Sequence, residues 1–218
     1  MTVKDVYDLI DHAAPFETQM ESDNSGFLVG SSSQAVDTIL FALDVTPAVI
    51  DEAVSLGAQL IVTHHPLMFS PVHALTDDTY EGKLIRRLVR EDISLISAHT
   101  NLDQAPGGIN DTLAERCGLM DVSGEGYFRC GLLPAPLSAG DFAADAGCDA
   151  FVSGEIRHHH ALAMAGSGIV GFECGHFGTE EPGIRALASA LQNTVNTIEC
   201  NVRIYVSGVS AYSFIRQP

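Results

Sequence analysis

Basic residues are scarce in this chain. Its 218 residues include 28 Asp and Glu but only 11 Lys and Arg, which gives a formal net charge of -17 at pH 7. Nucleic-acid binding depends on clusters of Lys and Arg that neutralise the phosphate backbone. The composition therefore argues against a nucleic-acid partner. The hydrophobic content of 46% over this length predicts a globular protein with a sizeable core.

Long apolar runs and paired cysteines are also missing. No stretch of about 18 apolar residues occurs, and the N-terminal MTVKDVYDLIDHAAP has acidic residues where a signal peptide needs an apolar core. The five cysteines are widely spaced and form no CxxC pair, so neither a disulfide framework nor a thiolate zinc site is indicated. We therefore expect a soluble, cytoplasmic protein with no membrane partner.

Short apolar runs alternate with helical patterns along the chain. Most runs are continuous, which indicates strands buried on both faces, and strands separated by helices predict an α/β fold with a mostly parallel sheet. The predicted strands are Asp37–Asp44, Leu60–Thr63, Ile93–Ala98, Ala150–Ser153, Gly168–Phe172 and Ile198–Val206. The predicted helices are Lys4–His12, Pro47–Leu56, Thr79–Arg90, Asn110–Cys117, Arg157–Ala165 and Glu181–Leu191. The Gly- and Pro-rich residues 124–140 form the one candidate internal boundary.

Polar groups follow three of the predicted strands at the point where each strand ends. They are His64 and His65 after LIVT, His99 and Asp103 after ISLISA, and His176 and Glu180 after GIVGFE. In open α/β sheets ligands bind beyond the carboxyl ends of the strands. The HxxxE spacing also places His176 and Glu180 on one helical face.

These groups suit a metal site. A single histidine after a strand is more often a hydrogen-bonded loop residue than a ligand, but three occurrences at strand ends favour convergence on metal. Imidazoles together with carboxylates fit two divalent ions, for which zinc, iron, manganese, nickel and cobalt are all candidates. The proposed ligands are His64, His65, Asp103, His176 and Glu180, and we expect His99 beside them rather than among them.

Five segments of the chain resemble the signature of a known family. They are DNSGFLVG, FALDVTP, IVTHHPLMF, SAHTNLDQAPGGIND and GHFGTEEPG, in this order. The pattern is similar to that of the Ngg-interacting-factor-three-like family, also labelled GTP cyclohydrolase 1 type 2 homologues. The resemblance implies a homohexameric toroid with a dinuclear metal centre in each subunit, held by the same five ligands. It has minor departures, since Phe177 stands where a tyrosine is often found.

The resemblance also implies an internal organisation. Each subunit would contain two similar α/β halves with the metal site between them, approximately residues 1–123 and 141–218, joined by the segment 124–140. The length of 218 residues resembles the short form of the family, which lacks a mid-chain insert.

A second histidine-rich stretch, SGEIRHHHALAMAG, follows the predicted strand that ends at Ser153. Neighbouring residues of a helix point about 100° apart, so only one of its consecutive histidines can face a site beyond the strand end. Glu155 and His158 are therefore the candidates for acid–base catalysis or for orienting the metal ligands. We expect the following two histidines to be partly exposed helix residues.

Two classes of function remain open. The first is a metal-dependent hydrolase of a nucleotide substrate, which would open the purine imidazole ring, as the family label implies, or cleave a phosphoester. The chain has no GxxxxGK[ST] motif, so GTP would not bind through a phosphate loop of that kind. The second class is a non-catalytic metal-binding or regulatory ring.

Overall fold

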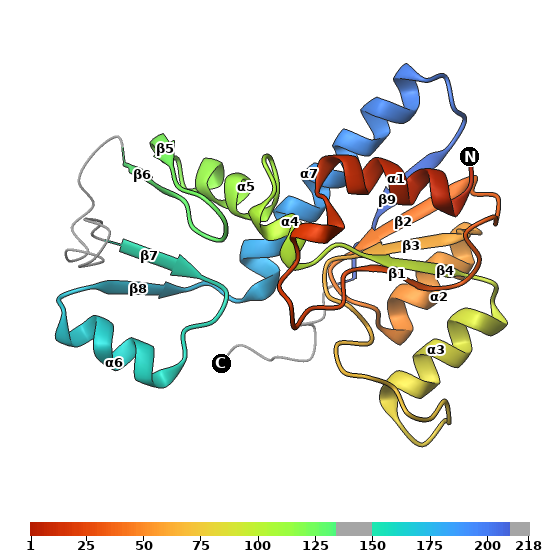
Figure 1. Ribbon diagram of the computed structural model, residues 1–218, viewed down its shortest axis with the longest axis horizontal. Helices are drawn as coiled ribbons and strands as arrows, with labels where there is room; N and C mark the ends of the chain where they lie inside the picture. Colours follow the sequence, from red (N-terminus) through yellow and green to blue (C-terminus); the bar gives the residue numbers. More distant parts are fainter. Residues whose placement is uncertain (134–149, 210–218) are drawn as a thin grey trace.

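A five-stranded sheet lies at the centre of the computed structural model, which describes residues 1–133 and 150–209. Its strand order is β1-β4-β3-β2-β9, in which β1 is antiparallel to β4 and the other neighbours are parallel (Figure 1). The strands are β1 (Gly26–Val29), β2 (Thr38–Ala42), β3 (Leu60–Thr63), β4 (Ser94–Ser97) and β9 (Arg203–Val206). The predicted α/β fold with a mostly parallel central sheet is confirmed.

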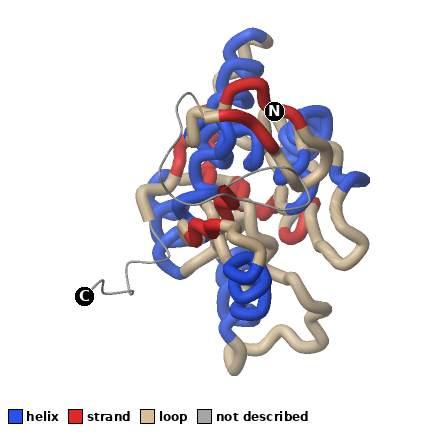
Figure 2. The backbone as a smooth tube through the Cα atoms, turned by 90° about the vertical axis from the view of Figure 1, so that its left-hand side faces the viewer, coloured by secondary structure: helices blue, strands red, loops and turns tan. Residues whose placement is uncertain are grey.

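Two layers of helices enclose this sheet, as Figures 1 and 2 show. Helices α1 (Val3–Ala13) and α7 (His176–Thr197) pack on one face. Helices α2 (Pro47–Leu56) and α3 (Tyr80–Arg90) pack on the other. The molecule therefore has one core on each side of the sheet.

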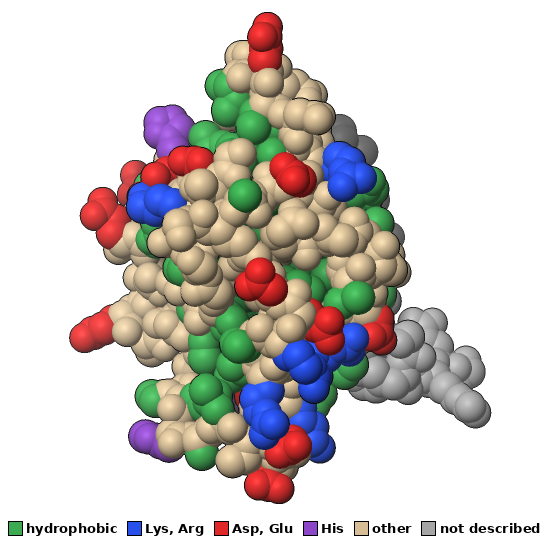
Figure 3. All heavy atoms as spheres, turned by 90° about the vertical axis from the view of Figure 1, so that its right-hand side faces the viewer, with side chains coloured by type: hydrophobic (Ala, Val, Ile, Leu, Met, Phe, Trp, Pro, Cys, Tyr) green, Lys and Arg blue, Asp and Glu red, His purple; other side chains and the backbone are tan. Residues whose placement is uncertain are grey.

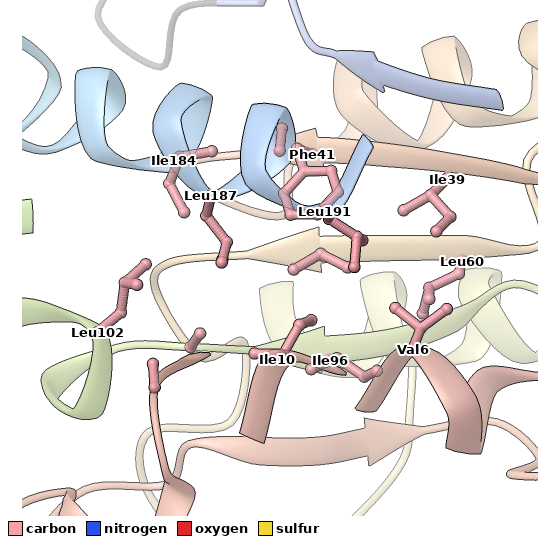
Figure 4. Close-up of a cluster of buried hydrophobic side chains, with 14 of the residues drawn as sticks. Val6, Ile10, Ile39, Phe41, Leu60, Ile96, Leu102, Ile184, Leu187 and Leu191 are labelled. Carbon is pink, nitrogen blue, oxygen red and sulfur yellow. The ribbon is translucent and has the colours of Figure 1, made fainter. Parts of the chain in front are cut away.

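Successive side chains of β2 enter opposite cores, because strand side chains alternate between the two faces. Ile39 and Phe41 pack with residues of α1 and α7 in the core drawn in Figure 4, whereas Leu40 packs against α2 and α3. Every residue of β2, β3 and β4 is buried, as their continuous apolar sequences predict. Complete burial of one such side chain contributes about 1.5–3 kcal/mol.

Local signals determine where the helices begin and end. At α2 the Thr46 hydroxyl accepts the Val49 N–H at 3.2 Å, Pro47 opens the first turn, and Gly57, with φ 64°, ends the helix in the left-handed conformation. Helices α1, α2 and α3 agree with their predictions to within one residue at each end. So do α5 (Ile109–Arg116) and α6 (His158–Gly166).

Helix α7 is much longer than predicted. The prediction began it at Glu181 because proline favours the first turn of a helix, but Pro182 is buried inside the helix, which begins at His176. The longer helix places His176 and Glu180 in its first two turns. The HxxxE spacing was therefore the better guide to this boundary.

A smaller region lies beside the main sheet, on the left of Figure 1. Strands β7 (Ala150–Ser153) and β8 (Val170–Glu173) form a parallel pair, and β5 (Met120–Ser123) pairs with β6 (Cys130–Leu132). The prediction that continuous apolar strands are buried on both faces is wrong for β7 and β8, where Phe172 is 42% exposed. The reason is that α6, which connects them, has no buried residue of its own and leaves both strands partly exposed.

Several short elements were not predicted from the sequence. They are β1, β5, β6, the 3-10 helix η1 (Phe16–Thr18) and α4 (Thr100–Gln104). Of the predicted strand Ile198–Val206 only β9 forms, because the chain up to Cys200 closes the end of α7.

The predicted division into halves stays a prediction, since part of its boundary lies outside the described residues. Strand β9, from the second proposed half, pairs with β2 of the first. Within residues 1–133 and 150–209, no helix is both long enough and apolar enough to span a bilayer.

Candidate metal centre

Strands β3 and β4 end side by side, and histidines follow both of them. Thr63 is opposite Ser97 in the parallel register, and their hydroxyl oxygens are 2.8 Å apart. His64 and His65 come directly after the first strand end, and His99 precedes α4 after the second. Parallel neighbours end at the same edge of a sheet, so the groups that follow them meet there, as predicted from the sequence.

The first two turns of α7 bring a third set of ligand groups to this edge. His176 donates its Nδ1–H to Oε1 of Glu180, one helical turn on, at 2.7 Å. The other oxygen of that carboxylate, Oε2, lies 3.1 Å from Nε2 of His65. The three strand ends that the sequence singled out therefore converge.

Four imidazole rings form the centre of this cluster. The ring centroids of His64 and His65 are 5.0 Å apart, and that of His99 is 5.0 Å from the first and 5.6 Å from the second. The ring of His176 lies 5.6 Å from that of His65. Such close packing of titratable rings is costly when they carry charge, so it favours neutral imidazoles that share a cation.

Acceptors behind three of these rings fix their orientation. The pairs are His64 with the carbonyl of Ala98 at 2.9 Å, His65 with Asp44 at 2.7 Å and His99 with Asp23 at 2.8 Å. Carbonyl and carboxylate oxygens can only accept, so each ring donates through Nδ1. Nε2 then faces the cluster and can ligate a metal once it carries no proton, which is the arrangement that acceptors behind metal-binding histidines produce.

His64 and Asp103 lie deepest in the cluster. The imidazole of His64 is 1% exposed, and this burial, reinforced by the nearby His65, lowers its pKa to about 3, so the ring is neutral at neutral pH. Its Nε2 is 3.4 Å from Oδ1 of Asp103. Burial, together with the charge of Glu180, raises the pKa of Asp103 to about 7. A cation beside this carboxylate would reverse that shift.

His65 lies between two carboxylates. Burial by itself lowers the pKa of His65, but the hydrogen bond to Asp44 and the adjacent Glu180 outweigh burial and raise its pKa to about 10. Glu180 Oε2 is buried and has no well-formed hydrogen bond to any described residue. In the metal-free protein a proton on His65 balances these acids, and a metal ion would take the place of that proton.

Comparison with known proteins finds a family whose model covers every residue of the cluster. A family model described as Duf34/NIF3 (NGG1p interacting factor 3) matches residues 1–146 and 141–212. This chain belongs to the Duf34/NIF3 family. The family resemblance expected from the sequence is thereby confirmed.

Two curated relatives illustrate the extent of the likeness. A protein of Clostridium acetobutylicum named GTP cyclohydrolase 1 type 2 homolog is 29% identical over 265 residues, which cover 98% of this chain and 99% of the relative. A protein of the same name from Halalkalibacterium halodurans is 41% identical over 117 residues, 54% of this chain. That match spans only 32% of the relative's length.

Solved structures share the fold. A hypothetical protein of Staphylococcus aureus is 26% identical with a TM-score of 0.85, covering 100% of this chain and 99% of the other. A Bacillus cereus protein related to NIF3 has the same TM-score of 0.85 at 21% identity, with the same coverage of both chains. The latter likeness shows the fold alone.

The side chains of this Duf34/NIF3 protein fit a metal centre. Two groups of three side chains each place one ligand atom within 4.8 Å of the other two. The groups are His64, His65 and His99, and His65, His176 and Glu180. Imidazole nitrogens with carboxylate oxygens are the donor set of zinc, iron, nickel, cobalt and manganese sites. The buried and unsatisfied Glu180 Oε2 is an acceptor that a cation would satisfy.

Of the two proposed catalytic residues, one has a described contact with the cluster and the other has none. Glu155 is exposed, and its Oε2 is 3.7 Å from Nε2 of His176, at the rim of the cluster. His158 is exposed at the first position of α6, and none of the described contacts joins it to the other histidines. Their roles stay predictions. The following His159 and His160 are exposed, as expected, with ring centroids 4.0 Å apart.

Sequence reasoning gave no role to Asp23 and Asp44, which hold two of the imidazoles. Asp44 is the last residue of the predicted strand Asp37–Asp44, so its place at a strand end was a signal for it. Asp23 lies 76 residues before His99 in a loop that precedes β1, and only the tertiary fold brings the two together.

Proposed function

We propose that this chain binds two divalent metal ions and hydrolyses a nucleotide. The observation that carries the proposal is the convergence of His64, His65, Asp103, His176 and Glu180, with imidazoles held by acceptors behind them. The relatives' name, GTP cyclohydrolase 1 type 2 homolog, supports a purine nucleotide as the substrate class. Cleavage of a phosphoester is the neighbouring chemistry at such a centre.

The side chains of the cluster would share the work of hydrolysis. Two bound divalent ions would supply Lewis acidity and lower the pKa of water. Asp103 and Glu180 supply negative charge that holds the cations, while Asp44 keeps His65 in the tautomer whose Nε2 can ligate. Glu155, exposed at the rim, would take or give a proton.

The proton balance of ring opening requires such a group. Water oxygen bonds to the carbon between the two imidazole nitrogens of the purine and loses a proton, while the nitrogen of the C=N bond takes one. The bond from this carbon to the other nitrogen then breaks as the C=O bond forms, so the hydroxyl loses its proton and the released nitrogen takes one. A carboxyl group at the rim of the site can serve both steps.

The test is turnover of a nucleotide panel by metal-reconstituted protein. Wild type should turn over GTP or a phosphoester only with metal, and Asp103→Asn, which removes a charge with little change of shape, should lose that turnover. Asp8→Asn, an exposed change on α1, is the matched control and should retain it. Turnover that persists in metal-free protein or in Asp103→Asn would contradict the hydrolase.

The second candidate function is a non-catalytic metal-binding or regulatory ring. In the described part of the chain, the carboxylates of the cluster form ion pairs with histidines and none with Lys or Arg. A triphosphate would therefore meet several acids and depend on the metals for positive charge. Metal binding without turnover of any substrate in the panel would favour this function.

Three further expectations belong to the proposal. The resemblance favours a homohexamer, and the protein is expected in the cytoplasm. The proposal includes no nucleic-acid partner, because the chain is strongly acidic and several of its described basic side chains are paired with acids. Arg86 lies 3.0 Å from Asp77 and Arg87 lies 2.5 Å from Asp51. Figure 3, which shows the side of the molecule that is on the right in Figure 1, has Lys and Arg next to Asp and Glu.

A further inference from the structure

His99 faces the cluster as closely as the proposed ligands do. One of its ligand atoms lies within 4.8 Å of ligand atoms on both His64 and His65. Its ring is packed edge-on against that of Phe69, with centroids 6.2 Å apart. The side chain is 20% exposed, so it is largely enclosed by the cluster.

The tautomer of His99 is set by Asp23. This carboxylate is 1% exposed and accepts the Nδ1–H of His99 at 2.8 Å. It is also fully satisfied, because it accepts from the Asn24 N–H at 2.8 Å, the Ser25 hydroxyl at 3.0 Å and the Thr100 N–H at 3.1 Å, and from the Thr100 hydroxyl. A carboxylate with this many donors stays ionised and keeps Nδ1 protonated. The lone pair of His99 is therefore on Nε2.

The loop that carries Asp23 is tied to both ligand-bearing loops. The Ser25 hydroxyl accepts the N–H of His99 at 3.2 Å, and the amide of Asn24 donates to the carbonyl of Met68 at 2.6 Å, in the segment after the adjacent histidines. Antiparallel pairing of β1 with β4 brings this loop to the end of β4. A buried polar network this complete holds the imidazole of His99 in one orientation.

We propose that His99 is a sixth metal-ligating residue of this centre and that Asp23 is its positioning residue. The inference rests on the proposed metal centre but not on hydrolysis. It adds a third imidazole beside His64 and His65, where Asp103 lies 3.4 Å from His64, whereas the group of His65, His176 and Glu180 includes its own carboxylate. Imidazole-rich sites suit zinc, cobalt, nickel and copper better than magnesium or manganese.

The sharpest variant is His99→Asn. The amide of asparagine can still donate to Asp23 in place of Nδ1, so a purely structural role of His99 survives the change, whereas the Nε2 ligand is lost. His73→Ala, which removes an exposed histidine with no described partner, is the matched control. Asp23→Asn keeps the ligand but weakens its support, for which loss of about 10–100-fold in metal affinity is typical.

The experiment titrates the metal-free full chain with cobalt(II) against a competing chelator and records the visible absorption bands, with circular dichroism as the check of folding. We expect His99→Asn to weaken one binding step by more than about tenfold and to shift the cobalt bands. The control should match wild type. Wild-type affinity and bands in folded His99→Asn would overturn the inference.

Two further outcomes separate this inference from the proposed function. Wild type that binds no cobalt would contradict both the inference and the proposed function. Weaker cobalt binding by His99→Asn, in a protein that turns over no nucleotide, would support the inference and contradict the hydrolase. If His99→Asn does not fold, proton magnetic resonance of cobalt-loaded wild type decides. Ligating imidazoles with an N–H give strongly shifted exchangeable signals, and four are expected from the histidines of the two groups. Three such signals would overturn the inference.

Discussion

Metal binding should release protons, and the number follows from the environments of His65 and Asp103. The pKa of His65 is raised to about 10 and that of Asp103 to about 7, so at pH 7 the first is protonated and the second is half protonated. Metal ligands must be deprotonated, so loading releases about 1.5 protons per chain from these two groups at pH 7. His64, whose pKa is lowered to about 3, releases none.

The sign of the pH dependence is the same for both groups. Each binds more protons in the metal-free protein than in the loaded one, so apparent metal affinity rises with pH. The release from the pair should be about 2 protons at pH 6, where Asp103 is mostly protonated, and about 1 at pH 8, where only His65 still holds its proton. Near pH 7, 1.5 protons correspond to about a 30-fold gain in apparent affinity per pH unit.

Calorimetric titration in buffers of different ionisation enthalpy measures the total proton release, and the difference between variants isolates the share of one group. At pH 8, Asp44→Asn should release fewer protons than wild type, because His65 loses the hydrogen bond to Asp44 that raises its pKa. Asp8→Asn, an exposed change on α1, should release as many as wild type. Equal release by wild type and Asp44→Asn, or no release between pH 6 and pH 8, would refute this account of the cluster.

Three other predictions follow from the same site and from the family. Metal-saturated protein should contain about two ions per chain by elemental analysis, and the double variant His65→Ala, Glu180→Ala fewer; one ion in saturated wild type would count against the centre. On acidification below the usual histidine pKa of about 6.5, bound metal and turnover should fall together before the circular dichroism changes, and metal retained at pH 4 would speak against histidine ligands. Light scattering should report about six times 23.2 kDa, and a monomer at every salt concentration would contradict the hexamer.

The central strands could be predicted because continuous apolar runs in the sequence indicate that they are buried on both faces. β2, β3 and β4 lie between two helical layers, so both faces need apolar side chains and the sequence shows no alternation. The same geometry explains why His64 and His65 were singled out, since they follow directly at the carboxyl end of such a strand, where ligands bind in α/β sheets.

Strand β1 and the carboxylates that orient the histidines could not be predicted, because they depend on contacts between distant segments. β1 is a four-residue edge strand that begins at a glycine and carries little periodic signal, yet its pairing with β4 is what brings Asp23 to His99. Asp44 and His65 are likewise joined only through the parallel register of β2 and β3. Ligand types follow from local sequence, whereas the carboxylates that orient the ligands follow from the tertiary fold.

Anomalous scattering from crystals of the metal-loaded protein, recorded on both sides of the metal's absorption edge, tests the central claim most directly. Two anomalous peaks per chain should lie among His64, His65, Asp103, His176 and Glu180, and both should vanish below the edge. A single peak there, or peaks only at other sites on the chain, would contradict a dinuclear centre at this edge of the sheet.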